Sequence, residues 1–137
     1  MSVAFVDTDV IVRLIAGDDP AKKEAAQALF AAVAEGRQSL VCPDTVIADA
    51  VYVLTSRQLY ALDRTLVASA LSFLVDLPNF RVAQRRAVRR ALDVFAQTRL
   101  DFGDAMLIAA MEDAGETVLY SYDHDFDRVS AIERRNP

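Results

Sequence analysis

The sequence has few of the residues on which disulfide bonds and many catalytic sites depend. Among 137 residues it holds one cysteine, Cys42, and one histidine, His124. A single cysteine cannot form an intrachain disulfide, which favours a reducing, cytoplasmic setting. His124 lies in an acidic stretch, where an exposed loop position explains it better than catalysis does. Zinc, thiol and histidine chemistry therefore find little support.

Long apolar runs and several well-known catalytic motifs are also missing. No apolar stretch approaches the roughly 20 residues that span a bilayer, and the N-terminus lacks the pattern of a signal peptide. We therefore expect a soluble protein without a membrane partner. The sequence contains no GxSxG, Walker A, GxGxxG, CxxC or HExxH motif. Any chemistry has to come from other side chains.

The charge is acidic overall but unevenly distributed. Hydrophobic residues make up 53% and charged residues 26%, which suits one globular domain over residues 1–137 without repeats or linkers. The net charge of −5 alone argues against binding nucleic acid. Five of the thirteen arginines, however, fall between Arg81 and Arg90. The acids collect at the ends of predicted elements, as Asp7 and Asp9, Asp101 and Asp104, and Asp123 and Asp125. A phosphodiester would need a metal ion at these acids and could be held by the arginines.

The hydrophobic pattern alternates between short apolar runs and helical periodicity. Strands are predicted at 3–6, 39–42, 80–82 and 117–121, and helices at 10–15, 21–35, 46–54, 63–74, 85–98 and 104–114. The tail from Arg128 carries no clear pattern. This alternation predicts an α/β layered fold with a mostly parallel sheet. Ligands of such sheets bind outside the carboxyl ends of the strands.

Two aspartates directly follow predicted buried strands. Asp7 comes after the run 3–6, and Asp123 comes just after the run 117–121. Both should project from the same edge of a parallel sheet. A strand-end turn or helix cap is the alternative for Asp7, and a solvated loop is the alternative for Asp123 and Asp125.

Three further aspartates lie on predicted helices. Asp101 is best interpreted as an N-cap, which places Asp104 at the third helical position, where the helix dipole favours an anion. Asp49 lies between Ala48 and Ala50 on an apolar helix, either as a solvated residue or facing the sheet edge. Gathered carboxylates repel one another, and a divalent cation relieves that repulsion. Ligands that are all oxygen suit Mg²⁺ or Mn²⁺ rather than zinc.

These acidic blocks resemble those of the PIN-domain ribonucleases, in particular the VapC-type toxins of toxin–antitoxin pairs. The resemblance covers nearly the whole chain, in the right order: Phe5-Val-Asp-Thr-Asp-Val10, Pro43 to Leu54, Asp101-Phe-Gly-Asp-Ala-Met-Leu-Ile-Ala-Ala110 and Ser121-Tyr-Asp123. It implies a three-layer αβα fold with a central, mostly parallel sheet of about five strands. It also implies an endoribonuclease with one or two Mg²⁺ or Mn²⁺ ions, a small antitoxin that blocks the acidic groove, and a homodimer.

The same resemblance implies roles for individual residues. The catalytic and metal-binding set is Asp7, Asp49, Asp104 and Asp123, supported by Asp9, Asp101 and Ser121. Two positions depart from the family pattern, because Asp49 replaces the usual Glu and Asp9 the usual Asn or Ser. An aspartate reaches about 1.3–1.5 Å less far than a glutamate. Phosphate contact and a solvated helix face are equally good interpretations of Arg85, Arg86, Arg89 and Arg90.

Two other interpretations stay open at this point. Asp7-Thr-Asp9-Val10 also matches the nucleophile motif of haloacid-dehalogenase-like phosphatases. Those enzymes need a lysine between their acidic motifs, and the only lysines here are Lys22 and Lys23, in an early helix. The third interpretation is a catalytically impaired PIN-like binding module, which the Asp49 departure keeps open.

Overall fold

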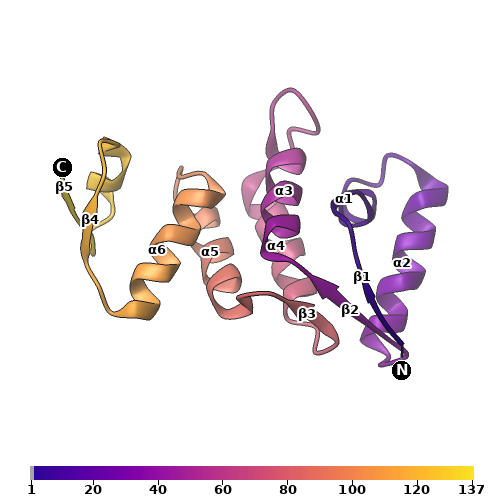
Figure 1. Ribbon diagram of the computed structural model, residues 1–137. Coiled ribbons are helices and arrows are strands. Elements are labelled where there is room, and N and C mark those ends of the chain that lie inside the picture. Colours follow the sequence, from indigo (N-terminus) through magenta and orange to yellow (C-terminus); the bar gives the residue numbers. More distant parts are fainter. Residues whose placement is uncertain (1) are drawn as a thin grey trace.

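A computed structural model describes residues 2–137 and confirms the α/β class (Figure 1). The N-terminal part contains β1 (Ser2–Phe5), α1 (Thr8–Ala16), α2 (Pro20–Ala34), β2 (Gln38–Cys42), α3 (Asp44–Thr55), α4 (Arg64–Val75) and β3 (Phe80–Val82). The C-terminal part contains α5 (Arg85–Gln97), α6 (Phe102–Ala114), β4 (Val118–Tyr120), the short 3₁₀ helix η1 (His124–Arg128) and β5 (Glu133–Arg135). None of the helices within residues 2–137 has the length and apolar character that crossing a membrane requires.

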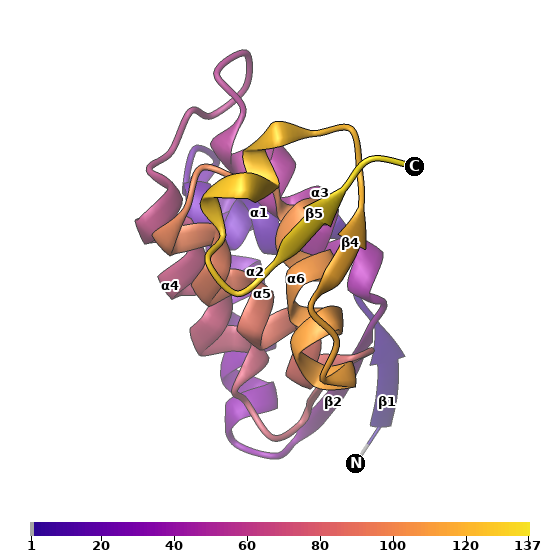
Figure 2. The ribbon, with the colours of Figure 1, turned by 90° about the vertical axis from the view of Figure 1, so that its left-hand side faces the viewer.

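The strands are all paired in parallel, as predicted, but they form two sheets. β1, β2 and β3 form one sheet in the order β1-β2-β3, and β4 pairs with β5 in the other. The described chain thus has the five strands expected from the family resemblance, without the single continuous sheet. Figures 1 and 2 show the reason, because α6 and α5 separate the β4–β5 pair from the rest of the molecule.

The strand β1 is more exposed than the sequence predicts. Val3 is 56% exposed and Phe5 is 73% exposed, although this run was predicted to be a buried strand. The prediction was wrong because β1 pairs with β2 on one side only and lies at the edge of its sheet. β4 was also predicted to be buried, and Tyr120 at its end is 63% exposed for the same reason.

The core lies mainly between helices α3 to α6 and the buried side of β2 and β3. Edge-to-face aromatic pairs join distant segments, with ring centroids 5.3 Å apart for Phe30 and Phe80 and 6.3 Å apart for Phe95 and Phe102. Cys42 is fully buried at the end of β2, and this burial, with a smaller effect of the Asp44 charge, raises the thiol pKa to about 12. It is therefore a core residue rather than a reactive thiol.

Arg64 fixes the junction between α5 and α6. Its Nη2 donates to the carbonyl oxygens of Phe95 at 2.9 Å, Thr98 at 3.2 Å and Leu100 at 2.5 Å. The guanidinium also lies over the Phe95 ring, 3.5 Å from its centroid. One charged side chain from α4 thus satisfies the carbonyls at the end of α5 and sets the direction in which α6 begins.

Candidate functional site

Asp7 connects β1 to α1. Its backbone is extended, and its carboxylate accepts a hydrogen bond from the Thr8 amide at 2.7 Å, so it is the N-cap of α1. The helix-cap alternative is therefore realised, but the side chain is exposed and one oxygen stays available. Asp9 follows in the first turn of α1 and is also exposed.

Asp49 lies on α3, the helix that packs beside α1. Its side chain is exposed, whereas Ile47, Ala50 and Val51 on the same helix are buried. The helix therefore buries its apolar side and leaves Asp49 on the surface. Asp49 therefore does not lie in a pocket that would bring a metal ion closer to its short side chain.

Asp104 is a predicted site residue whose surroundings shift the pKa of its carboxyl. Asp101 is the N-cap of α6 and accepts from the Asp104 amide at 2.8 Å, as the sequence predicts. Burial raises the pKa of the Asp104 carboxyl, and the charges of Asp101, Asp123 and Asp125 raise it further. The structure therefore brings the carboxylates of α6 and of the segment after β4 close together.

Asp123 is held by the turn that follows β4. Its carboxylate accepts from the Asp125 amide at 2.9 Å and caps η1, while its own amide donates to Ser121 Oγ at 3.0 Å. Ser121 thus positions the backbone of Asp123 rather than its carboxylate. Asp123 and Asp125 are both exposed.

Arg134 is a supporting residue that the sequence did not reveal. Its side chain is almost fully buried and donates to Asp127 at 2.8 Å and to the Ser121 carbonyl at 2.8 Å, which fixes the loop carrying Asp123. The Arg134 guanidinium, and after it His124, lowers the pKa of Asp127. His124 is exposed, as expected, and contacts Asp127 and Arg134. The only sequence signal was a short charged run in an unassigned tail.

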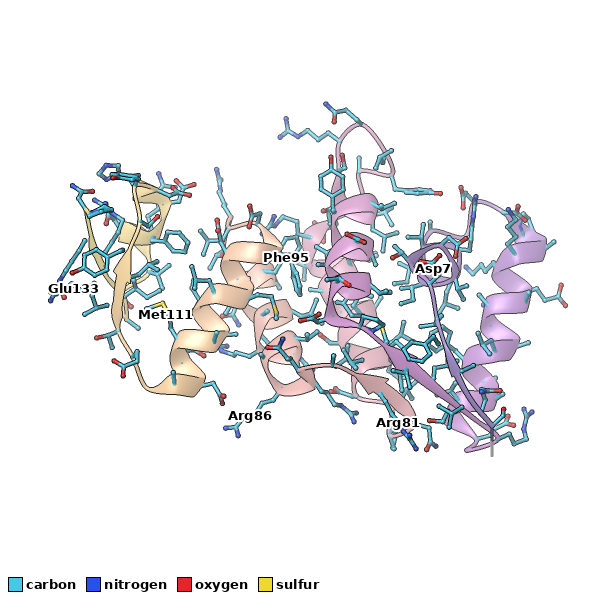
Figure 3. The ribbon with its side chains drawn as sticks, viewed as in Figure 1. Asp7, Arg81, Arg86, Phe95, Met111 and Glu133 are labelled. Carbon is cyan, nitrogen blue, oxygen red and sulfur yellow. The ribbon has the colours of Figure 1, made fainter. Side chains whose placement is uncertain are left out.

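The predicted acids come from two parts of the chain. Asp7, Asp9 and Asp49 belong to α1 and α3, and the other acids belong to α6 and the segment after β4. Within residues 2–137 no group of three or more acidic, cysteine or histidine side chains is placed to hold a metal ion. Figure 3 shows Asp7 far from Glu133, which lies on the strand paired with β4.

The four arginines of α5 all have partners within the protein. Arg85 donates to the Leu77 carbonyl at 3.2 Å. The other three form ion pairs with acids of α4, α5 and α6: Arg86 with Asp113 at 3.7 Å, Arg89 with Asp76 at 3.2 Å and Asp93 at 2.7 Å, and Arg90 with Glu112 at 2.8 Å. These pairs connect α5 to α4 and α6. RNA contact by these arginines stays a prediction, and Arg86, which is almost fully exposed, is the most accessible of them.

Most of the chain matches a known domain family. The family model described as the PIN domain matches residues 4–132, a segment that contains Asp7, Asp49, Asp104 and Asp123. The chain belongs to the PIN-domain family. PIN domains typically bind divalent metals, and this membership leaves the phosphatase interpretation of Asp7 and Asp9 without support.

The solved structures to which this chain is similar include a VapC and a VapBC structure. One is Mycobacterium tuberculosis VapC20, described as a toxin that cleaves the sarcin–ricin loop, at 19% identity and a TM-score of 0.41, covering 94% of this chain and 95% of that one. The other is VapBC2 of Rickettsia felis bound to a promoter DNA fragment, at 10% identity and a TM-score of 0.38, covering 98% of each chain. A comparison with curated proteins gave no match.

Proposed function

We propose that this PIN domain is a metal-dependent endoribonuclease and the toxin of a type II toxin–antitoxin pair. The observation that carries the proposal is the family match over residues 4–132, a segment that contains Asp7, Asp49, Asp104 and Asp123, the acids that the resemblance assigns to the site. The candidate ligands are all carboxylates, a set that fits Mg²⁺ or Mn²⁺. When bound, such a cation supplies the Lewis acidity that activates water and stabilises the leaving oxygen of a phosphodiester.

The residues of the chain prepare the site for that cation. Asp101 fixes the first turn of α6 and so orients Asp104, whose pKa is raised by burial and further by the neighbouring carboxylates. The hydrogen bonds that Asp123 makes to the start of η1 hold its carboxylate just beyond β4. Asp7 is held at the carboxyl end of β1 in the same way. Asp7 and Asp123 are exposed and Asp104 is half-buried, so an RNA backbone can reach these carboxylates.

The toxin role implies an antitoxin partner. The surface offers an apolar groove of about 530 Å³ between α1, α2 and α4, lined among others by Ile15, Phe30, Phe73 and Leu77. Phe73 is exposed although it is large and apolar, which is typical of a surface that a protein partner covers. We expect co-expression with the small protein encoded beside the gene to relieve toxicity. The toxin role would be contradicted if toxicity persisted on co-expression, or if the chain expressed alone were not toxic.

RNA cleavage tests the enzymatic role directly. Purified protein is assayed with Mg²⁺ or Mn²⁺, with EDTA, and as the variants Asp7→Asn and Asp104→Asn. We expect EDTA to stop cleavage and each variant to lose cleavage activity by about 10- to 100-fold or more. That range is typical when residues that hydrogen-bond to metal ligands are removed. Asp113→Asn, an exposed acid at the far end of α6, is the matched control and should stay active. Cleavage that resists EDTA would exclude the proposed mechanism.

A binding module without catalysis is the second candidate. It is favoured by the separation of the acids in a single copy and by the short side chain of Asp49. Calorimetry with Mn²⁺ distinguishes the two, because the enzyme should bind Mn²⁺ at millimolar concentration and the module should not. Asp49→Glu should raise cleavage by the enzyme, since it restores the reach of the usual family residue.

A further inference from the structure

Four strands lie at a sheet edge within the described residues 2–137, β1 and β3 in one sheet and β4 and β5 in the other. Phe80 and Val82 of β3 are buried and β5 consists of charged residues, so β1 and β4 are the edges that lack protection. β1 pairs only with β2, and β4 pairs only with β5, so each keeps one open edge. Open edges present rows of free amide and carbonyl groups, and proteins normally cover or disrupt them. Neither β1 nor β4 contains a proline or lysine that would protect its edge.

The hydrogen-bonding pattern shows which amides face these open edges. The Val6 amide donates to Val41 on β2 at 3.2 Å, and in a parallel pair alternate residues bond to each neighbour. Val3 and Phe5 therefore direct their amides to the open edge of β1. The Ser121 amide donates to Arg135 at 3.1 Å, so on β4 the outward amides are those of the alternate residues, Val118 and Tyr120.

The side chains of these four residues are apolar and exposed. Val3, Phe5, Val118 and Tyr120 are all among the exposed large hydrophobic residues of the protein. β-branched and aromatic residues favour strand pairing, and aromatic cross-strand pairs stabilise it. Both edges thus have the composition of an inner strand rather than of a permanent edge.

The two edges do not meet within one copy. The helices between them are fixed at both junctions, because Arg64 holds the α5–α6 turn and Phe126 anchors η1 in the core at 2% exposure. Leu119 and Ile132 of the β4–β5 unit also pack against that core. Figure 1 shows the helices α3 to α6 between β1 and the β4–β5 pair.

We propose that two copies of this chain pair reciprocally, with β1 of each copy adding in parallel to β4 of the other. The occupant of each open edge is then a second copy, and the strand order becomes β3-β2-β1 of one copy followed by β4-β5 of the other. This arrangement gives two five-stranded parallel sheets per dimer. It satisfies the outward amides of both edges and covers the exposed Phe5 and Tyr120.

The pairing also assembles the acidic site, a consequence that rests on the proposed function. The alternation of outward amides allows Phe5 to lie opposite Leu119 or Ser121 of the second copy, which brings Asp7 level with the second copy's Ser121 or Asp123. Adjacent strands lie about 4.8 Å apart. Each site then takes Asp7 and Asp49 from one copy and Asp104 and Asp123 from the other, so a single copy contains only half of each site.

Mixing two inactive variants tests the shared site. Asp7→Asn and Asp104→Asn copies are unfolded and refolded together, so that half of the dimers are mixed. In a mixed dimer one site carries both substitutions and the other carries neither, so activity should return to about a quarter of the wild-type level. Activity no higher than that of the separate variants, with active wild type, would overturn the proposal, because each copy would then hold its own complete site.

Strand pairing is tested without reference to activity. Phe5→Pro and Tyr120→Pro each remove an outward amide, and we expect both variants to be monomeric by light scattering with an unchanged circular dichroism spectrum. Ala4→Pro is the matched control, because the Ala4 amide faces β2 rather than the open edge. Loss of that amide should lower the free energy of unfolding without acting through the open edge. A monomeric wild type, or dimers that persist in both variants, would overturn the proposal.

Crosslinking locates the contact and separates the two proposals. A Phe5→Cys copy mixed with a Ser121→Cys copy should form a covalent heterodimer with a short bis-maleimide, while Phe5→Cys mixed with Arg57→Cys, in an exposed loop, should not. If these copies form the heterodimer but the wild-type protein cleaves no RNA, the strand pairing is supported and the nuclease proposal is contradicted. Cleavage by a protein that gives no such heterodimer would support the nuclease and contradict the pairing.

Discussion

At Asp104, burial and neighbouring charge both act against the ionised carboxylate. Half-burial at the start of α6 raises its pKa, and the carboxylates of Asp101, Asp123 and Asp125 add to this effect. The N-terminus of a helix favours an anion and offsets part of the cost. The fold thus disfavours the ionised form of Asp104, and a nearby cation would stabilise it.

This raised pKa predicts a pH-dependent effect of Asp104→Asn. A carboxyl with a raised pKa in the folded state contributes stability that is fully present below its unfolded pKa, about 3.9, and is lost as pH rises through the folded value. The free energy of unfolding of Asp104→Asn relative to wild type should therefore increase from about pH 3 to about pH 7. Urea unfolding at several pH values measures it.

The control for this experiment is Asp113→Asn, an exposed acid on the same helix. The pH dependence of Asp104→Asn is compared with that of this variant over the same range. An Asp104→Asn difference that stays constant or falls with rising pH would contradict the assignment. Addition of Mn²⁺ at neutral pH should reduce the advantage of the variant, because the cation relieves the same repulsion.

Residue-scale predictions from sequence succeeded where the signal was local. Asp101 as an N-cap and Asp104 three residues later follow from capping preferences, and the structure has both. Arg64 and Arg134 carry no such signal, because their roles depend on carbonyls that are distant in sequence or on a tail without periodicity. The placement of Asp7 relative to Asp104 likewise depends on how distant elements pack.

Among the elements, the α5–α6 hairpin depends on one side chain of α4. Arg64 donates to three carbonyls near the end of α5, so replacing it by methionine leaves these groups without a protein donor. We expect Arg64→Met to lower the free energy of unfolding by about 1.5–3 kcal/mol, the range for hydrogen bonds to charged groups. Arg64→Lys should lose less, since it keeps the charge but not the planar, multiple donors.

Chemical denaturation measures this effect, with Arg57→Met as the control. Arg57 is exposed in the loop after α3 and its replacement should change stability by less than about 0.5 kcal/mol. Equal stability of the Arg64→Met and Arg57→Met variants would show that the carbonyls find other donors. Weaker packing of the α5–α6 hairpin in Arg64→Met should also let β4 change position.

Helices were more predictable than strands at this scale. The periodicity predicts helices at 21–35 and 85–98, and the structure has Pro20–Ala34 and Arg85–Gln97. Four strands were found at the expected positions, but β5 lies in the tail that carried no pattern, and the sequence did not predict which strands would be edges. An apolar run such as Val3 to Val6 is compatible with an inner strand in any sheet, and its neighbour is decided by packing elsewhere in the chain.

For the whole molecule, metal binding and dimer formation should be linked. If each metal site takes ligands from two copies, Mn²⁺ favours the dimer and the dimer favours Mn²⁺ by the same factor. We expect saturating Mn²⁺ to lower the dimer dissociation constant by about 5- to 150-fold, the usual range of such coupling. Sedimentation equilibrium with and without Mn²⁺ measures it.

The variants Asp7→Asn and Asp104→Asn should abolish this linkage while leaving the metal-free dimer intact. Calcium, which accepts more flexible oxygen ligands, provides a second cation for comparison. A dissociation constant that Mn²⁺ does not change in the wild-type protein would mean that the two copies hold their metal sites separately.

The open edges of β1 and β4 also set the geometry of growth. If β1 of one copy pairs with β4 of another, as proposed, each molecule offers one edge of each kind and would assemble head to tail. Such contacts close into a ring when a twofold axis relates the copies and otherwise extend into a filament. The Phe5→Pro variant keeps the β4 edge alone and so acts as a chain terminator. Added in small amounts to concentrated wild-type protein, it should leave rings unchanged and shorten filaments.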